Sequence, residues 1–291
     1  PTPWSPPCSR PPRGRCGCPR RSASGSASCR RRSRGSRAAC PGRRRERAAS
    51  LRASLGVPAV VLNDLEANAW GLAELAPGDF EVLNRGEADP RGNGALISAG
   101  TGLGEAILFR SGAGFVPMPS EGGHASFAPR NDEEIELLKT LRLRHGHVSW
   151  ERVVSGPGLG TLYRFERVLS GLPEPEWLGR EIAASGDAAP VVSRAALDES
   201  DPVCQRTLHR FVSLFGAEAG NLALKALATG GVFVGGGIAP KILPLLRDGF
   251  FTAFTAKGRF APVLALLMSL SALPAVAAPP VAPRRPRPTR S

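Results

Sequence analysis

The sequence predicts an α/β fold for the middle of this 291-residue chain. Two observations lead to this prediction. Short apolar runs rich in valine, of the kind that form buried strands, alternate with longer stretches whose apolar residues have helical spacing. Glycine-rich turns follow several of the strand-like runs, and α/β folds bind their ligands at such strand ends.

Charge divides the chain into three parts. Residues 1–50 hold 14 Arg, no Lys and one acid, residues 51–260 hold 20 basic and 24 acidic residues, and residues 261–291 hold four Arg and no acid. The net charge of +13 therefore belongs to the two ends, and it is no reason to predict a nucleic-acid partner for the whole protein. Five of the six cysteines lie before residue 50. The middle has no disulfide framework and suits a reducing compartment, which predicts a cytoplasmic protein.

We expect residues 1–50 to be a disordered, Arg-rich head. Trp4 is its only aromatic residue, and it has no Leu, Ile, Val, Phe or Met to offset the entropy of ordering. The alternatives are a transit peptide, phosphate binding by its Arg clusters, and a metal site at Cys16 and Cys18. No aromatic residues interleave to stack bases, and no histidine or second close cysteine pair completes a metal site. The abrupt change in composition near residue 50 favours a solvated tail, or a stretch foreign to the reading frame of the body.

The body, residues 51–260, begins with the end of a helix, which Gly56 stops. Residues 57–62 are expected to form a buried strand because they are apolar and rich in valine. Asn63 and Asp64 follow this strand and precede a helix over residues 65–75. Polar residues at such a strand end occupy a ligand-binding position of α/β folds, although either residue can instead cap the helix.

Two further strands, residues 95–99 and 105–109, are expected to form a hairpin around the sequence Gly-Thr-Gly-Leu-Gly at residues 100–104. The backbone N–H groups of such a turn can face an anion, and a plain tight turn explains the same glycines. The turn is neither a Walker loop, since no Gly-Lys-Ser/Thr closes it, nor a Rossmann fingerprint, since it leads into a strand.

The next polar candidates lie on loops. Residues 120–127 place Glu121 and His124 on either side of two glycines, where they can present a carboxylate and an imidazole to one small polar ligand or form a surface turn. A metal site would need a third ligand that is not evident. Glu151 by itself reads as a surface acid, and the sequence after Ser155 opens another helix.

The long helix expected over residues 202–229 reads as scaffold. Its small residues recur at spacings of three and four, so one face can pack closely against a neighbouring element. We expect Glu218 to lie on its water-facing part. Residues 230–238 form the last strand of the body and run into Gly235, Gly236 and Gly237, which either seat a nucleotide against bare backbone or allow tight packing of helix on sheet.

Beyond the body, residues 261–278 are almost wholly apolar. Pro262 and Pro274 interrupt this stretch, so a core helix or an altered tail is a better interpretation than a membrane span.

Five stretches taken together resemble bacterial glucokinase, within the hexokinase and actin-like ATPase superfamily. They are LNDLEANAWGL (62–72), ISAGTGLGEA (97–106), PSEGGHASFAP (119–129), HGHVSWERVVSGPGLGTLYR (145–164) and GGVFVGGGIAPKIL (230–243). The resemblance covers residues 51–260. It implies an actin-like ATPase (ribonuclease H-like) sugar kinase fold with a truncated smaller lobe, assembled as a homodimer, with no nucleic-acid or membrane partner.

The resemblance also implies the phosphorylation of glucose at its 6-hydroxyl group by ATP with Mg²⁺. Asp64 matches the catalytic base of that family. The residues that match its sugar-binding groups are Asn63, Glu121, His124 and Glu151. The second phosphate loop matches Gly100, Thr101 and Gly102, and the adenosine segment matches Gly235, Gly236 and Gly237.

The chain departs from the family pattern in its first phosphate loop. We find no Asp-x-Gly-Gly-Thr strand, and the Arg-rich head stands where that strand is expected. Two interpretations follow: a glucokinase, whose activity in this chain depends on whether that loop is dispensable, and a glucose-binding or regulatory remnant without kinase activity. A sugar kinase of the repressor/kinase group is disfavoured, because residues 125–203 contain no cysteine for the zinc motif of that group.

Overall fold

The computed structural model describes residues 41–112 and 114–273. The chain divides into two compact units, residues 1–61 and residues 62–291. In the described part of the first unit, α1 (Pro41–Leu55) ends where the Gly56 N–H donates to the Arg52 carbonyl at 3.0 Å, with φ of 68° at Gly56. The helix includes residues 41–50, which the sequence placed in the disordered head. Its Arg, Glu, Ala and Leu residues are good helix formers. Residues 1–40 lie outside the described part of the chain.

The strand expected over residues 57–62 does not form. These residues belong to no strand or helix, and Val57, Val60 and Leu62 are exposed. A β-strand is stabilised by its hydrogen-bonded neighbours, and no described strand pairs with this segment. The valines of this segment favour a strand, but among the described residues the segment has no neighbouring strand to pair with.

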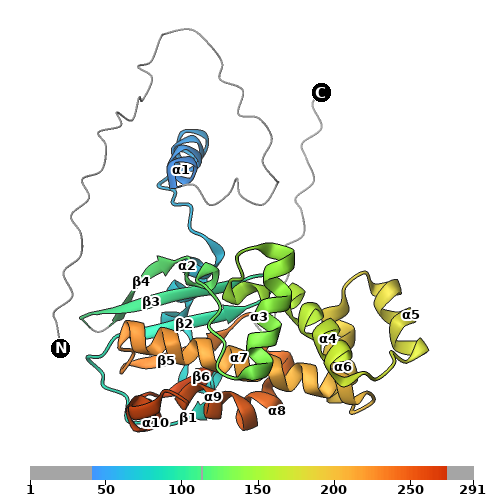
Figure 1. Cartoon of the computed structure of the whole chain (residues 1–291). Helices are drawn as coiled ribbons and strands as arrows, with labels where there is room; N and C mark the ends of the chain where they lie inside the picture. Colours follow the sequence, from blue (N-terminus) through green and yellow to red (C-terminus); the bar gives the residue numbers. More distant parts are fainter. Residues whose placement is uncertain (1–40, 113, 274–291) are drawn as a thin grey trace, which may run out of the picture. The chain divides into compact units, whose positions relative to one another are not determined.

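The second unit is built on one six-stranded sheet (Figure 1). Its strands are β1 (Glu81–Asn84), β2 (Gly94–Ala99), β3 (Leu103–Ser111), β4 (Gly114–Ser120), β5 (Gly231–Gly235) and β6 (Leu270–Ala272). The spatial order is β1-β6-β5-β2-β3-β4, with β6, β5 and β2 parallel and the outer strands antiparallel to their neighbours. The expected hairpin is confirmed as β2–β3, which pairs Ala99 with Leu103 around the glycine-rich turn.

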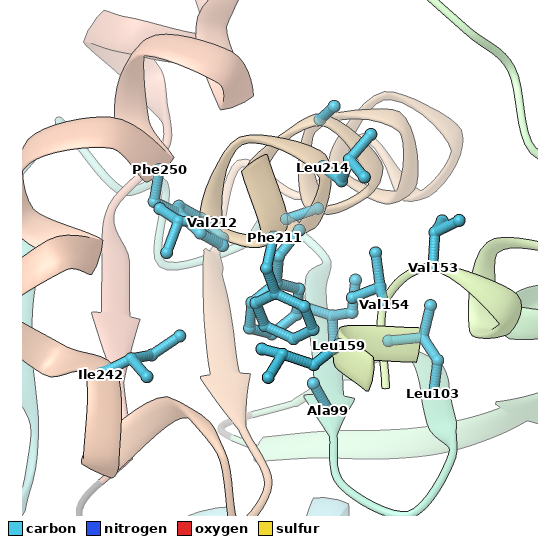
Figure 2. Close-up of a cluster of buried hydrophobic side chains, with 14 of the residues drawn as sticks. Ala99, Leu103, Val153, Val154, Leu159, Phe211, Val212, Leu214, Ile242 and Phe250 are labelled. Atoms are coloured by element: carbon cyan, nitrogen blue, oxygen red, sulfur yellow. The ribbon is translucent and has the colours of Figure 1, made fainter. Parts of the chain in front are cut away.

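Helices cover both faces of this sheet. The helices of this unit are α2 (Asp64–Gly71), α3 (Asp132–His145), α4 (Gly156–Ser170), α5 (Glu176–Ser185), α6 (Ala188–Leu197), α7 (Pro202–Ala226), α8 (Leu243–Leu245), α9 (Phe251–Thr255) and α10 (Ala261–Leu267). Figure 1 shows α7 running across the sheet with α4 and α6 beside it. The larger core lies on that face, where Phe211 of α7 lies near Leu159 of α4 and Ala99 of β2 (Figure 2). On the opposite face α2 buries Leu65 and Ala69 in a smaller cluster.

The close-packing face expected of the long helix is confirmed in α7. A Cβ atom added at Gly216 or Gly220 would lie 2.3 Å from the carbonyl oxygen of Phe250 or Phe254, respectively. Only residues without a side chain allow α9 and the turn before it to approach this closely. The expectation that Glu218 faces water is wrong, because its side chain is completely buried.

The apolar stretch after residue 260 is divided between two elements. Residues 261–267 form α10, and residues 270–272 form β6, which lies between β1 and β5 in the sheet. Of the two expected outcomes, a core helix or an altered tail, the helix is present over residues 261–267 with Leu264 buried, and residues 270–272 are an inner strand that was not expected. Residues 274–278 lie outside the described part of the chain. In the part of the chain that the structure describes, no helix has both the length and the apolar character needed to cross a membrane.

Candidate functional site

The turn between β2 and β3 is held by backbone hydrogen bonds. The Gly100 N–H donates to the Gly102 carbonyl at 2.9 Å, and the Gly156 N–H donates to the Gly100 carbonyl at 2.8 Å. The second bond ties the turn to the first residue of α4. A Cβ atom added at Gly102 would lie 2.6 Å from Oε2 of Glu151. Glycine at this position therefore leaves room for a carboxylate directly against the turn.

Glu151 is positioned from two directions. Its Oε2 accepts a hydrogen bond from the Leu103 N–H at 3.2 Å, and its carbonyl accepts one from the Ser155 hydroxyl at 2.7 Å. Ser155 also caps α4 by accepting from the Gly158 N–H. The neighbouring Trp150 is buried and packs edge-on against Phe127, with ring centroids 5.0 Å apart. The carboxylate is thus held by the fold and is not the free surface acid that its spacing suggested.

His124 lies between two carboxylates. Its Nδ1 atom is 3.9 Å from Oε1 of Glu151, and its Nε2 atom is 3.9 Å from Oε2 of Glu121. Both Glu121 and His124 belong to the loop after β4, where residues 122–124 form a 3₁₀ turn. The side chains of Glu121 and His124 are exposed and that of Glu151 is partly exposed. The structure therefore brings three of the sequence-predicted sugar ligands into one solvent-accessible cluster.

Asn63 and Asp64 begin α2. The Asn63 side chain accepts a hydrogen bond from the Glu66 N–H, so the capping interpretation holds for Asn63, and Oδ1 of Asp64 accepts one from the Leu65 N–H at 2.9 Å. Leu65 packs against the hairpin, because a Cβ atom added at Gly104 would lie 3.0 Å from both of its δ carbons. Among the hydrogen bonds and ion pairs of the described residues, none joins Asp64 to the cluster of Glu121, His124 and Glu151.

A cleft of about 870 Å³ opens on the other side of the turn. Gly100 and Thr101 line it from the turn, and Gly237 lines it from the segment after β5. Gly102 is directed toward Glu151 instead. Gly236 packs on the sheet, because with φ of 91° an added Cβ atom would lie 2.2 Å from the Ala99 carbonyl oxygen. The close contact at Gly236 is thus with strand β2 rather than with a helix, and an added Cβ atom at Gly235 would lie 3.0 Å from Cδ1 of Leu273. Gly237 faces the cleft.

The remaining walls of the cleft were missed by the sequence reasoning. Arg164 of α4, Asp187 and Arg194 at α6, and Lys241 after β5 supply charged groups to it. Lys241 was visible in sequence beside Pro240, whereas nothing in the α6 sequence marks it as a ligand wall. Within residues 41–112 and 114–273, no cluster of three or more His, Cys, Asp or Glu side chains is placed to hold a metal ion.

Comparisons with known proteins extend over the same part of the chain. A family model described as glucokinase matches residues 46–272. Glucokinase of Nostoc punctiforme is 41% identical over 228 residues, which cover 74% of this chain and 67% of that protein. Glucokinase of Synechocystis is 41% identical over 216 residues, covering 68% of this chain and 60% of that protein.

Solved structures agree. The crystal structure of glucokinase from an Antarctic psychrotroph is 34% identical, with a TM-score of 0.64, and the match covers 73% of this chain and 63% of that one. Glucokinase from Balamuthia mandrillaris, solved in complex with glucose, shares the fold with a TM-score of 0.59 at 22% identity, and the match covers 74% of this chain and 61% of that one. The expected actin-like ATPase sugar kinase fold is thereby confirmed. The chain spans roughly two thirds of the length of the relatives it matches. By family match and by sequence identity, this chain belongs to the glucokinase family.

Proposed function

We propose that this chain is a glucose kinase, which transfers the γ-phosphoryl group of ATP to the 6-hydroxyl group of glucose. One observation carries this proposal. The turn over residues 100–102 has the carboxylate of Glu151 against one side and the large cleft on the other. A sugar bound among Glu121, His124 and Glu151 and a triphosphate bound in the cleft would thus meet at the same few backbone atoms.

The three clustered side chains suit a polyhydroxylated ligand. Two carboxylates accept hydrogen bonds from hydroxyl groups, and an imidazole can donate or accept. Asn63 is proposed as a fourth sugar ligand. A site that hydrogen-bonds several hydroxyl groups penalises a sugar that lacks one of them, because its polar groups are then left without partners.

Asp64 is proposed as the general base. A carboxylate near the 6-hydroxyl group can accept its proton as the oxygen attacks the γ-phosphorus. The position of Asp64 in the first turn of α2 is fixed through Leu65, which packs on the β2–β3 hairpin. This arrangement holds the base on the same hairpin whose turn carries the Glu151 contact.

The cleft is proposed as the ATP site. Gly100 and Thr101 line the cleft with the backbone of the turn, the side chains of Arg164 and Lys241 offer positive charge for phosphates, and Gly237 leaves open backbone for the nucleoside. Mg²⁺ is usually held by one or two carboxylates together with the substrate phosphates, so it needs no cage of protein ligands. When bound, Mg²⁺ neutralises charge on the β- and γ-phosphates.

The family supports three further proposals: that the protein works in glycolysis, that it does so in the cytoplasm, and that it forms a homodimer. A second candidate function is a glucose-binding or regulatory protein without kinase activity. The absence of an Asp-x-Gly-Gly-Thr motif from the sequence favours it. Phosphoryl transfer depends on positioned phosphates, so losing a phosphate loop should lower the rate far more than the affinity for glucose.

Two measurements on one sample of the full chain test both candidates. Calorimetry measures glucose binding, and a coupled assay measures ATP-dependent formation of glucose 6-phosphate. We expect binding together with detectable turnover that is slower than the ordinary kinase range of roughly 1–100 per second, whereas binding with no turnover would favour the second candidate. Turnover within that range would refute the second candidate. Whatever turnover remains should fall by about 10²–10⁴-fold in Asp64→Asn, and an unchanged rate would remove Asp64 as the base. A chain that binds no glucose would overturn both.

A further inference from the structure

Two buried acidic side chains lie behind the sugar cluster. Glu105 of β3 and Glu218 of α7 are 1% and 0% exposed. The side chain of Glu218 lies near enough to that of Glu105 for its charge and hydrogen-bonding capacity to raise the pKa of Glu105. Oε1 of Glu105 is buried and meets no donor among the described residues, which is expected if its neighbour is a second carboxyl group. Two carboxyl groups can form a hydrogen bond only if one of them carries a proton.

Several donors surround Glu218, whereas Oε1 of Glu105 has none among the described residues. The Asn221 side chain donates to Oε2 of Glu218 at 2.7 Å, and Nζ of Lys225 lies 3.4 Å from its Oε1. Lys257 stands behind them, with its Nζ donating to Oδ1 of Asn221 at 2.6 Å and to the Ala217 carbonyl at 2.8 Å. Glu218 is therefore the member of the pair that the fold equips to carry a negative charge.

These surroundings set where the shared proton is held. Burial, followed by the charge of Glu218, raises the pKa of Glu105 to about 7, although Lys225 opposes this. Burial also raises the pKa of Glu218, against the lowering effects of Asn221, Lys225 and Lys257. The other charged groups near this network, Arg130 and Glu134, act on the pKa of Lys257.

The other side of Glu105 touches the sugar-binding loop. A Cβ atom added at Gly122 would lie 2.0 Å from Oε2 of Glu105, so this carboxyl group lies directly beneath the Gly122 backbone. Glu105 is also the cross-strand partner of Ser120, whose hydroxyl accepts from the Gly122 N–H at 3.0 Å. Gly122 stands between the proposed sugar ligands Glu121 and His124.

We infer that Glu105 is a positioning residue for the sugar site: a proton shared with Glu218 keeps its carboxyl group beneath Gly122 and thereby fixes Glu121 and His124. When that proton is lost, two buried negative charges repel each other. Glu218 keeps its donors, so Glu105 is the group displaced, and Gly122 is the backbone that it presses against. The inference rests on the proposed glucose binding for its functional meaning.

Glucose affinity as a function of pH tests this role in the full chain. If only the protonated pair holds the loop in place, the fraction of protein molecules able to bind glucose falls by up to roughly 30-fold between pH 6 and pH 8.5. The apparent Kd of glucose then rises in proportion. In Glu105→Gln the amide donates to Glu218 at every pH, so we expect less than about a twofold change. The glucose affinity of Glu218→Gln should be equally insensitive to pH, and this variant replaces Glu105→Gln in the test if Glu105→Gln does not fold. A pH dependence of glucose affinity that survived both substitutions would have another cause, and that result would overturn the inference.

Hydrogen exchange in the absence of sugar gives a second readout. The N–H groups of Gly122, His124 and Ala125 all donate within the loop. After correction for intrinsic rates, their protection should fall above pH 7 in the wild type and stay constant in Glu105→Gln. Glu166→Gln, at a buried glutamate that pairs with Arg206 and Arg210, should keep the wild-type profile. No fall in the wild type, or an equal fall in Glu105→Gln, would overturn the inference even if glucose binding itself were absent.

Discussion

At the scale of single residues, Gly102 sets the distance between the turn and the Glu151 carboxylate. In Gly102→Ala the new Cβ atom would require Oε2 of Glu151 to move, and this oxygen is the end of a flexible side chain. We expect the fold to survive and the Kd of glucose to rise roughly tenfold, which corresponds to about one lost charged hydrogen bond. Calorimetry measures the change. Gly71→Ala is the control, since an added Cβ atom there meets nothing within 4 Å. Equal effects of both substitutions would contradict the role of Gly102.

The buried Glu105 and the half-buried Lys257 should give the stability of this protein a characteristic pH dependence. The pKa of Glu105 is raised from 4.5 to about 7, so the native state binds more protons than the unfolded state between these values, and stability falls as pH rises through them. Burial lowers the pKa of Lys257 from 10.5 to about 8, so stability should rise again as pH increases from about 8 to 10.5. Urea unfolding across this pH range measures the fall and the later rise of the free energy of unfolding. Glu105→Gln should remove the fall and leave the rise unchanged.

At the scale of elements, α7 depends on glycine where it meets α9. A Cβ atom added at Gly220 would lie 2.3 Å from the backbone oxygen of Phe254, which cannot yield as a side-chain end can. We expect Gly220→Ala to lower the free energy of unfolding by about 1–3 kcal/mol. At Gly249 an added Cβ atom would stand in ordinary contact with Val212, so Gly249→Ala is the matched control with a smaller effect. Urea denaturation that ranked the two variants in reverse would contradict this account of the packing.

Elements with strong local signals were predictable from sequence, and elements defined by distant partners were not. The β2–β3 hairpin and α7 follow from alternation, glycine placement and spacing, which are local properties. Residues 57–62 have strand composition but no described strand beside them, and β-propensity is realised only in such a context. Glu218 looked like a surface charge because its burial follows from the packing of α7 against elements that are distant in sequence.

At the scale of the whole molecule, the site is made by elements that come together only in the fold. Glu121 and His124 lie on the loop after β4, and Glu151 lies before α4. Their spacing in the sequence suggested separate surface residues, and only the family resemblance predicted that they share one site. The walls of the cleft contributed by α6 carry no motif and were not predicted. The family resemblance thus pointed to the proposed ligand-binding groups, and the fold was needed to show which of them meet.

Glucose calorimetry on the full chain, its Glu151→Gln variant and its Glu136→Gln variant tests the central claim most directly. Glu136 is an exposed acid of α3 that pairs with Lys139 outside the cluster. The account predicts that the wild type and Glu136→Gln bind glucose equally and that Glu151→Gln binds at least about tenfold more weakly, through loss of a charged hydrogen-bond acceptor. Equal affinity of all three proteins, or no binding by the wild type, would contradict a glucose site at Glu121, His124 and Glu151.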